Sequence, residues 1–260
     1  MLLSMLLLLS ALIIFIHMTI FYAISLIKKD SSIVDIGWGL GFIFVAIISF
    51  IIGGNLFPKQ IIITSLVFLW GMRLAIYIFF RNKGKAEDWR YKKWRDDWGK
   101  NFAIRAYFQI FMLQGLFMFI ISVPIVLVNS NEIETFKLFD IVGSLIWIIG
   151  FIFEALGDYQ LSQFKKDPDN KGKIMKKGVW KYTRHPNYFG EVTMWWGIFI
   201  IALPLTNGIF TIISPILITF LLLKVSGIPL LEKKYKDNKE YQEYKKMTNA
   251  FFPFFPKSKD

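Results

Sequence analysis

The first 27 residues read MLLSMLLLLSALIIFIHMTIFYAISLI (Met1–Ile27) and contain no Asp, Glu, Lys or Arg. A helix needs about 20 mostly apolar residues to cross the hydrocarbon core of a bilayer. This stretch is long enough to cross, and it lacks the basic start that is typical of a secretory signal peptide. We therefore expect it to form a retained transmembrane helix.

Further apolar blocks follow along the chain, which is 55% hydrophobic and only 19% charged. A soluble domain of 260 residues could not bury so much apolar surface. The blocks predict an all-α integral membrane bundle of about seven transmembrane helices. We expect these helices to form one membrane domain over residues 1–260. The expected spans are 2–27, 33–53, 60–80, 104–128, 138–161, 188–206 and 208–229.

The distribution of basic residues predicts the orientation of this bundle. The net charge is +12, but the cations lie between apolar blocks and form no continuous patch, which argues against a nucleic-acid partner. Of the 31 Lys and Arg residues, 28 lie on alternate connections, and the positive-inside rule then places the N-terminus outside and the C-terminus in the cytosol. In a bacterium the host membrane would be the plasma membrane, and in a eukaryote the endoplasmic reticulum. The same basic loops are also explained by topology and lipid-headgroup contacts alone.

The strongest local motif reads GVWKYTRHPNYFGE (residues 178–191). Pro186 suits the first turn of a helix, so Arg184 and His185 are expected to project from the start of that helix, where a phosphate group is favoured. The first helical turns then carry three more candidate ligand-binding residues: Asn187, Tyr188 and Glu191. The alternative is an interfacial anchor built on a His-Pro turn.

Two acids precede this motif on one helical face. Glu154 and Asp158 lie four residues apart near the end of the fifth expected span. Asp158 is a candidate for binding a ribose or amide group of a nucleotide. An ordinary ion pair at the helix end, with Lys165 or Arg184, is the alternative.

The N-terminal half carries its own ionisable candidates. Asp35 follows SSIV (residues 31–34) at the start of the second expected span, where a carboxyl group could keep a proton and act as a general acid. A serine-rich helix start is the alternative. Arg73 lies in the middle of the third expected span, and a buried Arg needs an acidic or phosphate partner. A pairing of Arg73 with Asp35 would compete with the acid role of Asp35.

Two amphipathic stretches flank these segments. The first, 81–91, mixes cations, acids and aromatic residues and includes Tyr91. A solvated amphipathic helix in a loop would show the same pattern. The second is the tail from 232 to 256, which includes Tyr235 and alternates aromatic residues with charges. The tail could lie along the membrane interface or fold back as a lid over a bound ligand.

Several chemistries have no support in the sequence. There is no Cys, so disulfides and thiolate catalysis are excluded, and the two His residues are too far apart in the chain to indicate a metal site. No phosphate-binding loop of the Walker or dinucleotide type is present. The glycines of residues 37–41 fit close helix packing better than ligand binding.

Taken together, the motifs resemble a known family. Asp158-Tyr-x-Leu, the 178–191 string and Glu232-x2-Tyr235 are similar to the C-terminal half of the steroid 5-alpha-reductase family, and more distantly to sterol reductases and isoprenylcysteine carboxyl methyltransferase. SIVD-x-GWG (32–39), WG-x-RL (70–74) and ED-x-RY (87–91) resemble a branch of that family found in bacteria and eukaryotes.

This resemblance implies a seven-helix bundle that encloses NADPH and passes a hydride to the beta carbon of an enone. Residues 1–130 would form the lipid-substrate side and residues 131–260 the NADPH-binding half. Asp35, Arg73 and Tyr91 are the implied catalytic candidates. The implied cofactor-binding residues are Asp158, Lys165, Lys173, Arg184, His185, Asn187, Tyr188, Glu191 and Tyr235, and no metal is implied.

The chain also departs from the family pattern. The Gln-Glu pair of steroid reductases is absent as such, and Trp70 occupies the region of their catalytic Tyr, so the resemblance implies reduction but not steroid specificity. The leading hypothesis is an NADPH-dependent reductase of a steroid, sterol, isoprenoid or other lipid enone, with membrane lipids as its surroundings and no nucleic-acid partner. The alternatives are an S-adenosylmethionine-dependent methyltransferase of a lipid or isoprenylcysteine, and a non-catalytic lipid-binding membrane protein.

Overall fold

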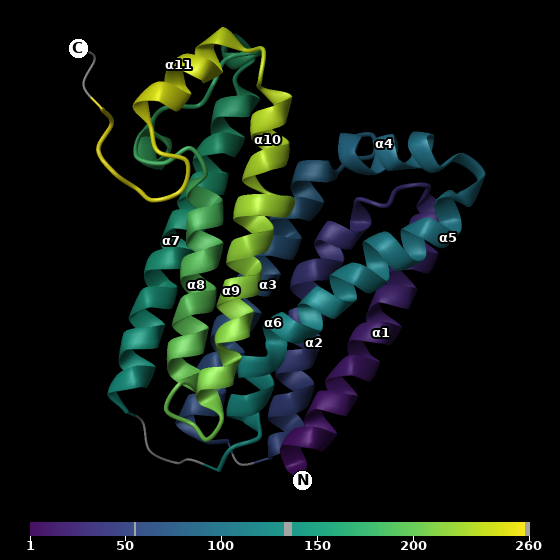
Figure 1. Cartoon of the computed structure of the whole chain (residues 1–260), viewed down its shortest axis with the longest axis vertical. Coiled ribbons are helices and arrows are strands. Elements are labelled where there is room, and N and C mark those ends of the chain that lie inside the picture. Colours follow the sequence, from purple (N-terminus) through teal and green to yellow (C-terminus); the bar gives the residue numbers. More distant parts are fainter. Residues whose placement is uncertain (55, 133–136, 258–260) are drawn as a thin grey trace. The chain divides into compact units, whose positions relative to one another are not determined.

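The computed structural model describes residues 1–54, 56–132 and 137–257, and within them the chain is helical and contains no strand (Figure 1). This confirms the predicted all-α class. The α-helices are α1 (Leu2–Lys28), α2 (Ile33–Gly53), α3 (Pro58–Asn82), α4 (Trp89–Trp98), α5 (Phe102–Ala106), α6 (Leu113–Asn129), α7 (Leu138–Lys166), α8 (Pro186–Ala202), α9 (Ile213–Phe220), α10 (Ile228–Lys234) and α11 (Lys239–Met247).

Six helical segments of the described residues are long and apolar enough to cross a membrane, which makes the chain a multi-pass membrane protein. They are Leu2–Lys28, Ile33–Gly53, Pro58–Asn82, Trp89–Asn129, Leu138–Lys166 and Gly208–Lys234. The sixth predicted span, 188–206, is not among them; it overlaps α8, which has 17 residues and ends before Pro204. At 1.5 Å per residue, α8 would cover about 26 Å of a hydrocarbon core about 30 Å thick. Its crossing of the membrane and the orientation of the termini stay predictions.

The chain divides into two compact units that are interleaved in sequence. The first unit comprises Met1–Asp140 and Ile201–Ser214, and the second comprises Ile141–Ile200 and Pro215–Asp260. The predicted single domain with halves at 1–130 and 131–260 stays a prediction.

In the first unit, α2 packs against α1, α3 and α6. Helices α2 and α3 approach so closely that a Cβ atom at Gly39 would lie 2.6 Å from the carbonyl oxygen of Gly71. A Cβ atom at Gly41 would meet the side chain of Met118 on α6. The glycines at 39 and 41 therefore serve helix packing, as expected for small residues in membrane helices.

The predicted spans 33–53 and 60–80 leave Lys59 in the connection between them, but the structure places it inside a helix. It lies in the first turn of α3, and its Nζ is 2.9 Å from Asp140 Oδ1, with 3% and 0% of the two side chains exposed. A charge buried to this degree needs a partner of opposite sign. The pair therefore belongs to the interior of the first unit and not to its surface.

In the second unit, glycines allow α7 and α8 to approach each other closely. A Cβ atom at Gly150 would lie 2.5 Å from the carbonyl oxygen of Gly190, and a Cβ atom at Gly197 would lie equally close to that of Gly143. The two pairs are seven residues apart on each helix, so the same faces meet over two turns. This contact fixes the start of α8, which carries the 178–191 motif, against α7.

Candidate functional site

The first polar cluster surrounds Asp35 in the first turn of α2. The Tyr91 hydroxyl donates a hydrogen bond of 2.5 Å to Asp35 Oδ1, and Arg90 Nη2 donates one of 3.0 Å to Asp35 Oδ2. Asp88 caps the start of α4 by accepting from the Arg90 amide, and it also accepts from Arg90 Nε at 2.9 Å. The cap therefore places Arg90 and Tyr91 together on Asp35. Tyr91 is 3% exposed, and the Asp35 side chain is 17% exposed.

A second pairing ties the same two segments together. Arg95 donates to both carboxylate oxygens of Glu87, at 2.9 and 2.8 Å, and Glu87 also accepts from the Ser31 amide at 2.7 Å. Burial raises the pKa of Glu87, but the hydrogen bonds from Arg95 and Ser31 outweigh it and leave the pKa lowered. The strings 31–35 and 87–91, which the sequence could only list separately, thus meet in space.

A pocket of about 540 Å³ lies in the second unit, between the end of α7, the loop that follows it, α10 and α11. Its polar lining includes Lys165, Lys171, Lys173, Arg184 and His185. Its aromatic lining includes Phe164, Trp180, Tyr235, Tyr241 and Tyr244. The rings of Tyr235 and Tyr241 stack, with centroids 5.1 Å apart. Cations and aromatic rings therefore face the same space.

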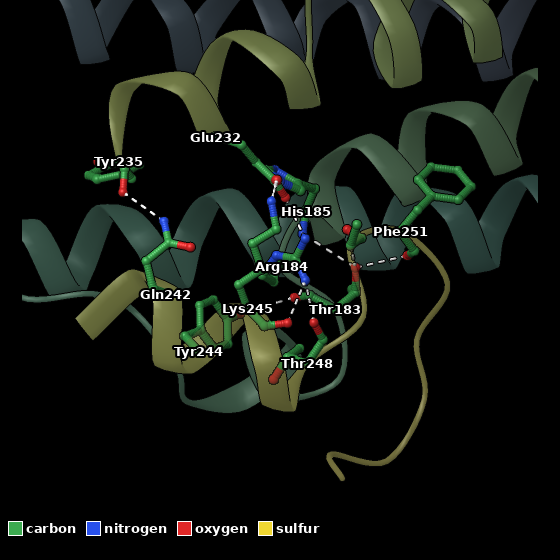
Figure 2. Close-up of polar contacts among 11 residues, drawn as sticks. Thr183, Arg184, His185, Glu232, Tyr235, Gln242, Tyr244, Lys245, Thr248 and Phe251 are labelled. Carbon is green, nitrogen blue, oxygen red and sulfur yellow. Dashed lines mark hydrogen bonds and ion pairs between the residues drawn. The ribbon is translucent and has the colours of Figure 1, made fainter. Parts of the chain in front are cut away.

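Arg184 joins the motif loop to α10 and α11 (Figure 2). Its Nη2 donates to Glu232 Oε1, and its Nη1 donates to the carbonyl oxygens of Lys245, at 3.3 Å, and of Thr248. Lys245 Nζ donates to the other oxygen of Glu232 at 2.5 Å. The guanidinium of Arg184 therefore closes the C-terminal end of α11, where carbonyl groups need donors.

Other contacts hold α11 against the motif. The Tyr244 hydroxyl donates to the carbonyl oxygen of Trp180, and the Trp180 indole donates to the carbonyl oxygen of Gly157 at 3.0 Å. Burial raises the pKa of the Tyr244 hydroxyl, so that it stays a donor. Glu240 accepts from the amide of Ile174, which also lines the pocket, at 3.1 Å. One wall of the pocket is thus built from the motif loop, α7 and α11.

His185 lies beside this network and is 3% exposed. Burial lowers its pKa, and the nearby carboxylate of Glu232, 3.8 Å away, only partly offsets this effect. Neither ring nitrogen has a hydrogen-bond partner. A buried polar group that lines a pocket without a partner is suited to a polar ligand.

The structure brings together five of the nine predicted cofactor-binding residues around this pocket: Lys165, Lys173, Arg184, His185 and Tyr235. The other four lie outside its lining. Asp158 is 5% exposed on α7, and Asn187, Tyr188 and Glu191 lie on the first turns of α8. The Asn187 side-chain oxygen is buried and has no hydrogen-bond partner. Among the catalytic candidates, Asp35 and Tyr91 are in contact, and Arg73 lies half-buried on α3.

Sequence reasoning missed three parts of this arrangement. It offered Asp158 or Glu154 as the partner of Arg184, whereas the structure shows Glu232, which is 48 residues away in the chain. It did not name Arg90 as the partner of Asp35. It placed Tyr241 and Tyr244 in the tail from 232 to 256 but did not predict that they line the pocket, although their three-residue spacing puts them on one face of α11.

Comparison with known proteins identifies the family. Residues 21–248 match the family described as "Protein of unknown function (DUF1295)". The chain belongs to the DUF1295 family. This DUF1295 chain is also similar to proteins named "3-oxo-5-alpha-steroid 4-dehydrogenase 1". The family match and these relatives together confirm the predicted resemblance to steroid 5-alpha-reductases.

The similarity to individual relatives is partial. The DUF1295 chain is 35% identical to the Bos taurus protein over 57 residues, which is 22% of each chain. It is 22% identical to the Rattus norvegicus protein over 116 residues, which is 44% of this chain and 41% of the relative. The chain thus spans less than half the length of these relatives. No solved structure matches it.

Proposed function

We propose that this protein is a membrane-embedded, NADPH-dependent reductase that transfers a hydride to a conjugated carbon–carbon double bond of a steroid, sterol or other lipid enone. The observation that carries the proposal is the pocket of the second unit, where lysines and aromatic rings face one space of about 540 Å³. This volume lies within the range of about 300–1,000 Å³ that is typical of ligand pockets. The names of the relatives supply the reaction class.

The lining of the pocket fits a phosphorylated dinucleotide. Lys165, Lys171 and Lys173 would pair with phosphate oxygens, and the stacked rings of Tyr235 and Tyr241 offer a flat apolar surface for a base. The ring nitrogens of His185 lack partners and would be satisfied by polar groups of the ligand. NADPH, when bound, supplies the hydride.

The Asp35 cluster of the first unit contains groups of the kind that proton transfer in this reaction needs. Hydride addition to the beta carbon of an enone puts negative charge on the carbonyl oxygen, and a proton must then reach the alpha carbon. Tyr91 holds a hydroxyl proton in a hydrogen bond to Asp35, and Arg90 neutralises that carboxylate. We assign Tyr91 to proton donation, Asp35 to holding the Tyr91 hydroxyl through its carboxylate, and Arg90 to the positioning of Asp35, while Arg73 stays a candidate on α3.

The proposed substrate class rests on the names of the relatives and on the membrane-spanning character of the helices. The relatives are named for a 3-oxo steroid, and this chain places its polar clusters among helices that are apolar enough to cross a membrane. A lipid-soluble enone would reach such a protein from the bilayer. With the N-terminus outside, the pocket of the second unit would open to the cytosol, where NADPH is available.

S-adenosylmethionine is the ligand that competes with this assignment, because the 178–191 motif also resembles a methyltransferase. That cofactor has no phosphate group and would leave the pocket lysines without an anionic partner. Thermal unfolding of the detergent-purified protein separates the two ligands. NADPH should raise the unfolding temperature more than NADH does, and S-adenosylmethionine should leave it unchanged. Stabilisation by S-adenosylmethionine alone would replace the reductase with a methyltransferase.

A further inference from the structure

The segment after α11 presents an exposed row of aromatic side chains. Phe252 and Phe254 are each 61% exposed, and Phe255 is 84% exposed. Three exposed phenylalanines within four residues are costly in water and mark a surface that contacts something apolar. None of the three lines the pocket of the second unit.

The backbone of this aromatic tail (residues 250–257) is fixed to the motif loop. The Thr183 hydroxyl donates to the carbonyl oxygens of Ala250, at 3.1 Å, and of Phe251, at 2.8 Å. The Phe254 amide donates to the carbonyl oxygen of Tyr182 at 3.0 Å. The rings are therefore held outward by a bonded backbone, and they do not swing over the pocket as a lid would.

The inner side of the aromatic tail contacts the start of an apolar helix. The ring of Phe189, in the first turns of α8, lies 5.7 Å from the ring of Phe251 and 6.4 Å from that of Phe252. On α7, Tyr159 is 61% exposed and Leu156 is 41% exposed, which continues the apolar surface of a candidate membrane span. The tail thus lies beside the start of α8. In Figure 1 the loop of the tail follows α11 near the label of α7.

Lysines flank the rings of the tail. The ammonium group of Lys181 lies 5.9 Å from the ring centre of Tyr182, whose ring is 5.6 Å from that of Phe255. Lys257 is exposed at the other end of the tail. Aromatic rings next to lysines are suited to the boundary between acyl chains and anionic headgroups.

We propose that Phe252, Phe254 and Phe255 insert into the headgroup boundary of a bilayer that contains anionic phospholipid, with Lys181 and Lys257 at the phosphate level. The aromatic tail is then an interfacial anchor. Because Thr183 and Tyr182 connect the tail to the motif loop, this anchor holds one wall of the pocket at a fixed depth below the membrane surface. The anchor does not depend on which ligand the pocket binds.

The absence of Cys from the chain makes a direct depth measurement possible. Phe254→Cys and Phe255→Cys variants would each carry one nitroxide spin label, in nanodiscs of phosphatidylcholine and phosphatidylglycerol. The matched control is Asp237→Cys, an exposed position between α10 and α11 that lies outside the tail. Collisions of the label with oxygen, which enters lipid, are compared with collisions with a water-soluble nickel chelate.

We expect the ratio of oxygen to nickel collisions to be several-fold higher at positions 254 and 255 than at 237, which places these labels about 5–10 Å below the headgroup surface. Ratios equal to that at 237 would overturn the proposal, because the tail would then lie in water. Labels shielded from both reagents would also overturn it and would indicate a protein contact. The measurement uses no NADPH or substrate, so its outcome is independent of the proposed reductase activity.

Discussion

Arg184 is the residue that connects the parts of the pocket wall. Its guanidinium bonds to Glu232 on α10 and to carbonyl groups at the end of α11, and its side chain is 6% exposed. A cation this deeply buried is costly without an anion beside it. A phosphate bound here would therefore share Arg184 with Glu232, and Arg184 would act mainly by positioning α10 and α11.

Replacing Glu232 with Ala should destabilise the protein by about 3 kcal/mol, because Arg184 would remain buried without its carboxylate partner. The matched control is Lys245→Gln, which removes the exposed partner of the same carboxylate and should cost less than about 1 kcal/mol. Thermal unfolding in detergent measures both. Equal losses in the two variants would show that the buried contact between Arg184 and Glu232 is not the stabilising one.

At the scale of the helices, the contact between α7 and α8 determines where the 178–191 motif lies. A methyl group at Gly190 would run into the carbonyl oxygen of Gly150, and backbone atoms cannot move aside without separating the helices. The start of α8 would move with them.

We expect Gly190→Ala to cost about 1–3 kcal/mol, as overpacking of a close contact does. Gly115→Ala in α6 is the control, because its added methyl group would meet only side chains, the nearest at 3.3 Å, and those can adjust. Thermal unfolding of both variants gives the comparison. If Gly115→Ala lowered the stability as much as Gly190→Ala, the contact between α7 and α8 would not be unusually sensitive to an added methyl group.

The sequence predicts the long helices well, because hydropathy and helix length determine them together. The predicted span 33–53 coincides with α2, whereas α3 extends the predicted 60–80 by two residues at each end. Hydropathy and helix length do not predict the end of α7 or the presence of α4. Helix α7 continues to Lys166, beyond the predicted end at 161, because polar residues can prolong a helix past the apolar core. The amphipathic α4 lies in a segment whose charge pattern also fits a loop.

At the scale of the whole molecule, family membership and the multi-pass membrane character follow from strings that are visible in the sequence. The pairings between those strings do not. Asp35 and Arg90 are 55 residues apart, and Arg184 and Glu232 are 48 apart. Periodicity and capping act over a few residues, so they cannot indicate that Arg90 contacts Asp35. That contact depends on how the helices of the first unit pack.

The central claim is that the pocket of the second unit binds a phosphorylated dinucleotide through its lysines. Lys171 and Lys173 are exposed and line the pocket, so replacing both with Gln should leave the fold intact. The matched control replaces Lys233 and Lys236, which are exposed and lie outside the pocket lining.

The decisive measurement is the dissociation constant for NADPH of these two double variants and of the unmodified protein, at one fixed salt concentration. Loss of the pocket lysines should weaken NADPH binding about tenfold or more, because a hydrogen bond to a charged group contributes about 1.5–3 kcal/mol. The control variant should bind NADPH as the unmodified protein does. Equal affinities in both double variants, or no NADPH binding by the unmodified protein, would contradict the account.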